Sequence, residues 1–192
     1  MKFLIFAEDS KNAGGIASKL RDSGDVHAII MKDQVEASSS YGIKKIYGLT
    51  GKPFADNVAE SITKLNPSSF DLLVISSTTL GREVAGIISA KQNLLCATEV
   101  FDFTLQNGKI VTKRFFYGGK TIMEEESEAK IITVTPGSFD PQNGEKTSEF
   151  EDIQLPQSKV NLIETKPKEK SSTNIEGANI IVSVGRGIGK KE

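Results

Sequence analysis

The sequence is poor in the residues that build disulfide frameworks, zinc sites and histidine-based active sites. Its 192 residues include one cysteine, Cys96, one histidine, His27, and no tryptophan. One cysteine cannot form an internal disulfide, and together with one histidine it falls short of the ligand set of a structural zinc site. A nucleophile would need His27 as its base, and His27 lies in an apolar run typical of a buried strand. These scarcities exclude a disulfide scaffold and a zinc module, and they disfavour a histidine-dependent hydrolase.

The chain also lacks a charge imbalance and a long apolar segment. It has 24 Lys and Arg against 25 Asp and Glu, a net charge of -1, and no local basic stripe, unlike nucleic-acid-binding and membrane-surface proteins. The longest apolar runs, residues 3–7 and 72–75, are far shorter than the ~20 residues that cross a bilayer. A strand pattern starts directly after Met1 and Lys2, without a signal-peptide cleavage site. We therefore expect a cytoplasmic protein that binds no nucleic acid and inserts into no membrane.

The amino-terminal half alternates short apolar runs with segments of helical periodicity, the pattern of parallel strands joined by crossover helices. Strands are predicted at residues 3–7, 26–31, 44–47 and 71–76, and helices at residues 13–20, at residues 53–65 and after Arg82. The strand at residues 44–47 is short and contains lysine, which is typical of a sheet edge. The pattern predicts a three-layer, Rossmann-like α/β fold with a mostly parallel sheet.

After Asn93 the pattern changes to that of antiparallel strands. The dipeptide Asn107-Gly108 stands between two apolar runs, which is a strong hairpin signal. Strands are predicted at residues 99–105, 109–116, 121–124 and 130–135, the last two joined by an acidic turn through residues 124–126. The sheet is therefore expected to have an antiparallel carboxy-terminal part, in a domain of residues 1–137.

From Ser138 to Glu176 the composition is polar, and this stretch has too few apolar residues to form a core of its own. We interpret residues 138–176 as a linker or arm, and its few apolar positions leave open an edge strand or packing across another surface. Residues 178–184 return to the pattern of a buried strand. Because such a strand needs sheet neighbours, we interpret residues 177–192 as the start of a second domain that is truncated or split from this chain.

A glycine-rich turn follows this last strand at Gly185, Arg186 and Gly187. A buried strand that leads into such a turn is the usual start of a nucleotide-binding βα unit, because glycine lets the backbone approach a phosphate. The motif is weak by itself, and its position after a linker strengthens it. These three residues are the predicted cofactor-binding residues, and no catalytic residue or metal ligand is predicted.

Six short segments, in order along the chain, match the pattern of a known family. They are residues 3–8 (FLIFAE), 80–85 (LGREVA), 98–100 (TEV), 114–119 (RFFYGG), 133–139 (TVTPGSF) and 181–189 (IVSVGRGIG). Together they resemble the α subunit of electron transfer flavoproteins, whose last segment opens the FAD domain. The resemblance covers nearly the whole chain. It departs from the family where Phe115 replaces Pro, Lys120 replaces Asn, Thr135 replaces Arg and Val184 replaces Gly.

The resemblance implies an electron carrier component rather than an enzyme: a heterodimeric FAD protein that collects electrons from acyl-CoA or other dehydrogenases. It implies a β subunit as partner and an amino-terminal domain of the adenine nucleotide α-hydrolase type that supports the FAD domain. That FAD domain is expected in cis or as a separate polypeptide, so this chain alone is expected not to retain FAD. The resemblance also implies that Arg186 contacts FAD, while Gly185 and Gly187 allow close approach of the backbone.

A second interpretation is a stand-alone module that binds an adenine nucleotide and has no redox role. Open α/β sheets bind ligands beyond the carboxyl ends of their strands, here near residues 7–12 and 76–79. No Gly-x-Gly-x-x-Gly follows the first strand, which counts against a dinucleotide at this place. The Ser/Thr cluster at residues 76–79 also fits the role of a helix N-cap. Glu8 and Asp9 fit the role of a solvated loop charge or of a helix cap better than a role in acid–base catalysis.

Overall fold

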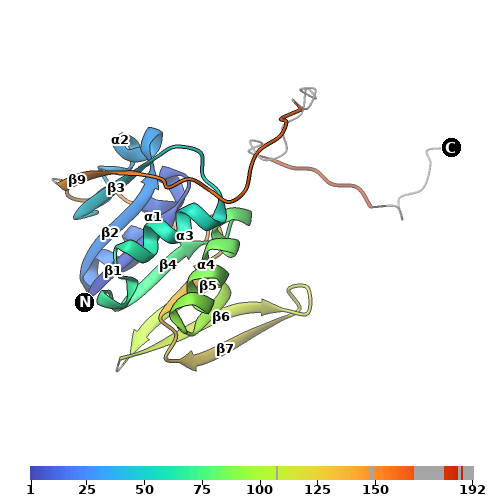
Figure 1. Ribbon diagram of the computed structural model, residues 1–192. Helices are drawn as coiled ribbons and strands as arrows, with labels where there is room; N and C mark the ends of the chain where they lie inside the picture. The colour runs from blue at the N-terminus through green and yellow to red at the C-terminus, as the bar shows by residue number, and fades with distance from the viewer. Residues whose placement is uncertain (107, 148, 167–179, 186, 188–192) are drawn as a thin grey trace. The chain divides into compact units, whose positions relative to one another are not determined.

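The computed structural model describes residues 1–106, 108–147, 149–166, 180–185 and 187. The chain forms two compact units, Met1–Val160 and Asn161–Glu192. The first unit contains the helices and strands described below (Figure 1).

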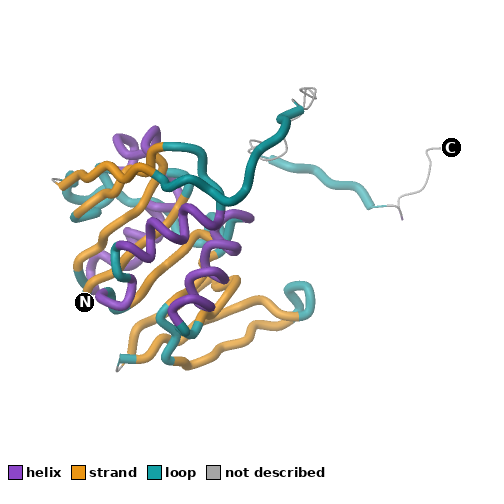
Figure 2. The backbone as a smooth tube through the Cα atoms, in the orientation of Figure 1, coloured by secondary structure: helices purple, strands orange, loops and turns teal. Residues whose placement is uncertain are grey.

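The described residues of the first unit build a nine-stranded sheet in the order β7-β6-β5-β8-β4-β1-β2-β3-β9 (Figures 1 and 2). The strands are β1 Lys2–Ala7, β2 Asp25–Met31, β3 Lys45–Thr50, β4 Leu72–Ser76, β5 Cys96–Gln106, β6 Lys109–Phe116, β7 Thr121–Ser127, β8 Ile131–Val134 and β9 Glu149–Gln154. The helices are α1 Ser10–Leu20, α2 Val35–Ser38, α3 Ala55–Lys64 and α4 Thr79–Gln92, with short 3-10 turns η1 Arg21–Ser23, η2 Lys32–Gln34 and η3 Pro67–Ser69. The pairs β5–β6 and β6–β7 are antiparallel, and all the other pairs, β5–β8 included, are parallel. The predicted fold class is confirmed.

The core lies in two layers, one on each face of the sheet. In β1, Phe3 and Ile5 belong to the cluster that α1 covers, while Leu4 and Phe6 belong to the cluster that α3 and α4 cover (Figure 1). Successive side chains of a strand point to opposite faces, so a strand buried on both faces must be apolar throughout. The continuous apolar run at the start of the sequence is therefore the direct consequence of a central position between two helical layers.

Two predictions about the ends of the sheet are wrong. Strand β3 is not an edge strand, because β9 pairs parallel to it along its full length, and Lys45 forms an ion pair of 2.7 Å with Glu151 of that strand. The acidic residues 124–126 do not form a turn but continue β7, where each forms an ion pair with a basic residue of β6, directly opposite for Glu124 and diagonal for the other two. Cross-strand ion pairs thus keep a charged sequence in a strand.

Residues 138–160, which we call the strap, follow β8, pass along α1, where Phe139 lies on Gly15 and Gln142 bonds to Ser18, and include β9. Arg21 of η1 donates to the carbonyl oxygens of Gln142 and Asn143 at 2.8 and 3.1 Å. Farther along, Leu155 is buried in the core layer beneath α3 and α4. The first unit therefore extends to Val160, beyond the boundary at residue 137 that composition predicts. Main-chain pairing, the buried Leu155 and the partly buried Phe139 and Ile153 hold a segment that has no core of its own.

The strap ends at the amino terminus of α3. The carboxylate of Asp56 accepts a 2.6 Å hydrogen bond from the Ser158 hydroxyl and a 2.7 Å bond from the Lys159 backbone N–H. These bonds lower the pKa of Asp56, the Ser158 hydroxyl contributing most. Asn57 donates to the carbonyl oxygen of Pro156 at 3.2 Å. The last residues of the strap are thus fixed where α3 begins.

The strand predicted over residues 178–184 is not observed in the described residues of the second unit. Residues 180–185 form neither helix nor strand, and Ile180, Val182 and Val184 are exposed; residues 178 and 179 lie outside the described ranges. A single apolar segment without sheet neighbours has no ladder to join. The interpretation of residues 177–192 as the start of another domain stays a prediction.

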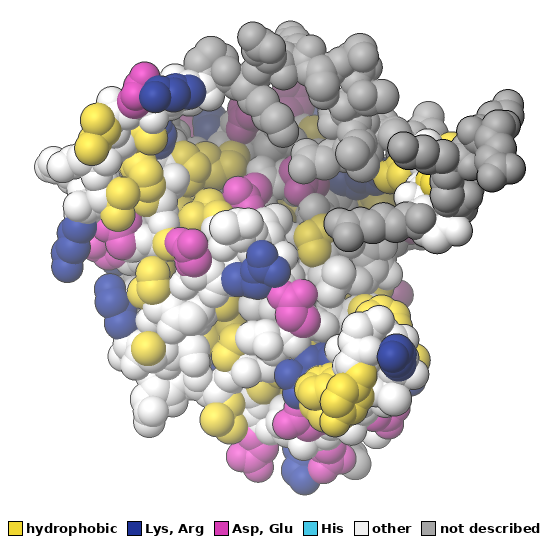
Figure 3. Space-filling view, turned by 90° about the vertical axis from the view of Figure 1, so that its right-hand side faces the viewer, with side chains coloured by type: hydrophobic (Ala, Val, Ile, Leu, Met, Phe, Trp, Pro, Cys, Tyr) yellow, Lys and Arg dark blue, Asp and Glu magenta, His cyan; other side chains and the backbone are white. Residues whose placement is uncertain are grey.

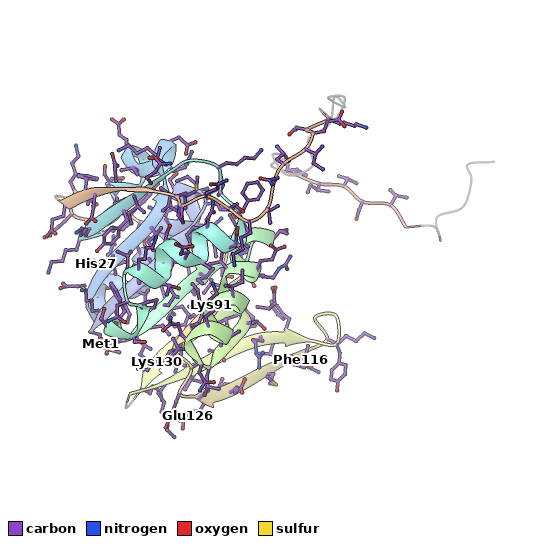
Figure 4. The ribbon with its side chains drawn as sticks, viewed as in Figure 1. Met1, His27, Lys91, Phe116, Glu126 and Lys130 are labelled. Atoms are coloured by element: carbon purple, nitrogen blue, oxygen red, sulfur yellow. The ribbon has the colours of Figure 1, made fainter. Side chains whose placement is uncertain are left out.

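His27 at the start of β2 is buried and is expected to make stability depend on pH (Figure 4). Its ring packs edge-on against Phe70 at 5.5 Å, and its Nδ1 has no hydrogen-bond partner among the described residues. Burial lowers the His27 pKa below its ordinary value, and the nearby Lys2 charge adds to this. The folded state therefore prefers the neutral ring, so this contribution is complete above the ordinary histidine pKa and is lost as the pH falls through the lowered value.

We expect the free energy of unfolding of the wild-type chain to fall between pH 7 and pH 5 more steeply than that of a His27→Phe variant. Urea unfolding at both pH values measures this difference. Equal pH dependence in the two proteins would show that His27 carries no protonation cost in the folded state.

Candidate functional site

The carboxyl ends of β1, β4 and β8 are the place where an open α/β sheet usually binds a ligand. In this chain only a shallow depression remains there, with an empty volume of about 170 Å³ that includes open solvent. Its walls come from α1, β4, β8 and the segment after β8, namely Asn12, Ile16, Ser76, Val134, Thr135, Gly137, Ser138 and Phe139. Small-molecule pockets usually measure roughly 300–1,000 Å³, so the depression is too small for a nucleotide.

The segment after β8 fills this crevice. A Cβ atom on Gly15 of α1 would lie 2.1 Å from the carbonyl oxygen of Phe139, so glycine lets the segment lie directly on the helix. The Gly137 backbone N–H donates to Asn12 Oδ1 at 3.1 Å, and the Phe139 ring packs edge-on against Phe103 at 5.7 Å. The sequence signals a Pro-Gly turn here, but nothing local indicates that the turn folds back over the binding crevice.

Both helix amino termini at this edge are already capped. Asp9 accepts a 2.8 Å hydrogen bond from the Asn12 backbone N–H, and its carboxylate occupies the place where α1 would attract a phosphate. Thr78 caps α4 by accepting a 3.0 Å bond from the Gly81 backbone N–H. The capping alternative for the Ser/Thr cluster is therefore correct, and neither the volume nor the helix termini of this edge suit an adenine nucleotide.

Three of the six family-like segments meet beside this crevice. The Ser77 hydroxyl donates to Glu99 Oε1 at 2.6 Å, and Arg82 lies 3.3 Å from the same oxygen. The Glu99 backbone N–H donates to the Thr133 hydroxyl at 2.9 Å, and Glu99 has a φ of 56°, in the left-handed region that non-glycine residues rarely adopt. The Arg82 and Glu99 side chains are about half exposed. The cluster is a surface polar network that fixes the bulge in β5.

A second candidate surface is the ribbon of β6 and β7, which extends beyond the helical layers (Figure 2). Phe115 and Ile122 on this ribbon are exposed by 58% and 60%, and Tyr117 at its tip by 80%. The Phe115 ring stacks on Phe101 of β5 with ring centroids 4.2 Å apart. Figure 3 looks onto this end of the molecule, where hydrophobic side chains gather, and Figure 4 marks Phe116 near the tip.

Ion pairs cross the ribbon beside these apolar residues. Lys109 lies 2.6 Å from Glu126, Lys113 lies 3.5 Å from Glu124, and Arg114 is paired with Glu125. The hydrogen bond to Glu126 raises the pKa of Lys109. Exposed apolar side chains next to an ordered charged rim are typical of a protein–protein interface.

The predicted cofactor-binding residues belong to the second unit. Gly185 lies outside helices and strands of that unit, Gly187 is described without its neighbours on either side, and Arg186 lies outside the described residues. Their role stays a prediction. Cys96 is half-buried, and burial raises its thiol pKa to about 11, so it is a poor nucleophile.

The described residues contain no group of three or more His, Cys, Asp or Glu side chains placed to hold a metal ion. Within the same ranges, no helix is long and apolar enough to cross a membrane.

The sequence pattern of the electron transfer flavoprotein domain matches residues 5–158. The chain belongs to the electron transfer flavoprotein family. Members of this family are electron carriers rather than enzymes, as the resemblance implies. The match spans the sheet from β1 to β9, so the strap is part of the family domain.

Curated relatives of the chain are the proteins named FixB. The FixB protein of Salmonella typhimurium strain LT2 is 28% identical over 203 residues, which cover 98% of this chain and 64% of the relative. The FixB protein of Escherichia coli O127:H6 is 26% identical over 184 residues, covering 88% of this chain and 58% of the relative. The chain therefore spans less than two thirds of the length of these relatives.

Proposed function

We propose that the chain is the amino-terminal part of an α-type electron transfer flavoprotein subunit. In this proposal it works in the cytoplasm as a scaffold that pairs with a β-type subunit and supports FAD-mediated electron transfer from dehydrogenases. The observation that carries the proposal is the family match over residues 5–158, which covers nearly all of the α/β unit Met1–Val160. The six family-like segments and the length shared with the FixB proteins support it.

The α/β unit supports a scaffolding role because its ligand crevice is filled. The segment after β8 lies on Gly15, and Asp9 and Thr78 occupy the two helix termini at the carboxyl edge. The residues at this edge do not fit FAD, which needs more space than the depression of about 170 Å³ provides. We therefore propose that FAD is held by polypeptide beyond the first unit, supplied in cis or by a separate chain.

The turn formed by Gly185, Arg186 and Gly187 is proposed to take part in that FAD site. A guanidinium can pair with a phosphate through two hydrogen bonds or donate to a flavin carbonyl, and its permanent charge favours the anionic reduced flavin. Glycine on either side lets the backbone approach the cofactor.

Replacing Arg186 with alanine is expected to weaken FAD binding at least about tenfold in the reconstituted flavoprotein, because a charge-assisted bond contributes roughly 1.5–3 kcal/mol. Equilibrium dialysis with FAD and a redox titration of the flavin measure the effect. Lys190→Ala, a charge removal in the same stretch, is the control. Unchanged FAD affinity and unchanged flavin potential in Arg186→Ala would remove this residue from the proposed site.

A further inference from the structure

We propose that the open edge of β9 binds an extended segment of another protein in which a basic, an apolar and a basic residue follow one another. The contact surface consists of Glu149, Phe150 and Glu151, which we call the β9 edge. It lies at the opposite end of the sheet from the ribbon of β6 and β7 (Figure 1). The inference goes beyond the proposed function and does not depend on it.

Strand β9 ends the described sheet and pairs with β3 alone. A strand that is hydrogen-bonded on one side presents a row of backbone donors and acceptors on its other side, and an extended peptide can add there as a further strand. The six residues of β9 include no proline, which would interrupt this row, and no lysine, which commonly protects a sheet edge. Strand β9 is therefore suited to strand addition.

The side chains of β9 alternate between the two faces of the sheet. Glu151 lies opposite Tyr47, on the face that α3 and α4 cover, and Glu149 shares that face. Phe150 lies opposite Ile46, on the face that α1 covers. Because Phe150 is 52% exposed, much of its apolar surface remains free to contact a side chain of a partner strand. The β9 edge thus offers two carboxylates on one face and an aromatic ring on the other.

Strand β3 shows which sequence lies favourably beside these residues. Lys45 stands opposite Glu149 and forms an ion pair of 2.7 Å with Glu151. The next residue, Ile46, stands opposite Phe150. The Glu151 side chain is still about half exposed, and Glu149 takes part in no ion pair among the described residues. A basic-apolar-basic segment on the open side would therefore place a cation beside each glutamate and an apolar side chain beside the ring.

The charge of β9 decides which class of partner fits. Glu149, Glu151 and Asp152 are acidic, and no basic residue lies on the strand. Pairing of β9 with its own copy, parallel or antiparallel, would bring carboxylates close to carboxylates, and like charges opposite each other destabilise a sheet. The same charges repel the phosphates of a nucleic acid or of an anionic lipid surface. The edge therefore favours a basic protein segment over a second copy of this chain.

The test uses the whole chain and a synthetic peptide with blocked ends, in which three arginines alternate with two valines. This order places basic-apolar-basic triplets on the strand in either direction. The comparison peptide has glutamate in place of each arginine. Fluorescence anisotropy of the labelled peptides at low salt measures the Kd, and changes in the amide NMR spectrum of the chain locate the bound peptide.

The test variants are Phe150→Ser and Glu149→Lys, which remove the ring and reverse one charge of the β9 edge. The matched controls make the same changes elsewhere on the surface. Leu95→Ser alters an exposed apolar residue ahead of β5, and Glu83→Lys reverses an exposed charge on α4. Thermal unfolding of each variant verifies that it folds like the wild type.

We expect the wild-type chain to bind the basic peptide in preference to the acidic one, with amide shifts concentrated in β3 and β9. Each test variant is expected to raise the Kd at least about threefold, the size of a cross-strand contact, while both controls stay within about twofold of the wild type. Added salt is expected to weaken the binding. No preference for the basic peptide, amide shifts confined to other strands, or a Kd that both test variants leave unchanged would overturn the inference.

Discussion

Replacing Gly81 with alanine is expected to lower the free energy of unfolding by about 3 kcal/mol, at the upper end of the usual cost of overpacking. Gly81 lies in the first turn of α4, where the helix backbone packs directly on the end of β4. A Cβ atom there would be 1.9 Å from the carbonyl oxygen of Ser76, a backbone atom that cannot rotate away. The helix or the strand end has to shift, and the Ser77–Glu99 contact beside it shifts too. Urea unfolding of the first unit measures the loss.

Gly86 on the same helix is the matched control. A Cβ atom at Gly86 would meet nothing within 4 Å, so alanine adds helix propensity without a clash. Gly86→Ala is therefore expected to raise the free energy of unfolding by about 0.5–1 kcal/mol. Opposite signs for the same substitution on one helix separate close packing from propensity, and equal signs would contradict the close approach of α4 to β4.

Replacing Leu155 with alanine is expected to lower the free energy of unfolding by about 2–3 kcal/mol, the range for truncating a buried leucine. Leu155 directly follows β9 and is 6% exposed, in the core layer with α3 and α4. It is the most deeply buried apolar residue of the strap, because Phe139 and Ile153 are only partly buried against the core layers. The strap of the variant is therefore expected to open more often than the rest of the sheet, with faster limited proteolysis between residues 138 and 160.

Leu162→Ala makes the same chemical change in the second unit, where the side chain is 50% exposed. Its effect on the free energy of unfolding is expected to stay within about 0.5 kcal/mol, as for most surface substitutions. If Leu155→Ala were equally mild and left proteolysis unchanged, the strap would behave as a linker rather than as part of the domain.

The sequence predicts the centre of the sheet well because a central parallel strand has a local signal. The apolar runs of β1 and β4 are buried on both faces, and their periodicity needs no knowledge of their neighbours. The Asn-Gly turn similarly predicts the hairpin of β5 and β6, because turn chemistry is local.

Strand β9 has no such local signal. Residues Glu149 to Asp152 are exposed, and the strand exists because β3 offers an unpaired edge about a hundred residues earlier in the sequence. The acidic run in β7 misleads for a related reason, since Glu124–Glu126 depend on the basic residues of β6. Whether a polar segment forms a strand depends on the strand with which it pairs. The local sequence pattern contains only one of these two strands.

Part of the candidate site can likewise be predicted from the local sequence, and part of it cannot. The motif segments around Arg82, Glu99 and Thr133 are visible in the sequence, but their meeting at one edge follows only from the strand order β5-β8-β4. The filled crevice depends on the contact between Gly15 and Phe139, which are far apart in the chain. A pattern of residues can therefore indicate the family. That the segment after β8 fills the crevice can be seen only in the folded structure.

The most direct test of the central claim is native mass spectrometry of this chain co-expressed with the β-type subunit of the same genome. An α-type subunit is expected to appear as a complex with one copy of each chain, and the isolated chain is expected to appear without flavin. Two separate species at micromolar concentration, or a homodimer of this chain that excludes the β-type subunit, would contradict the claim.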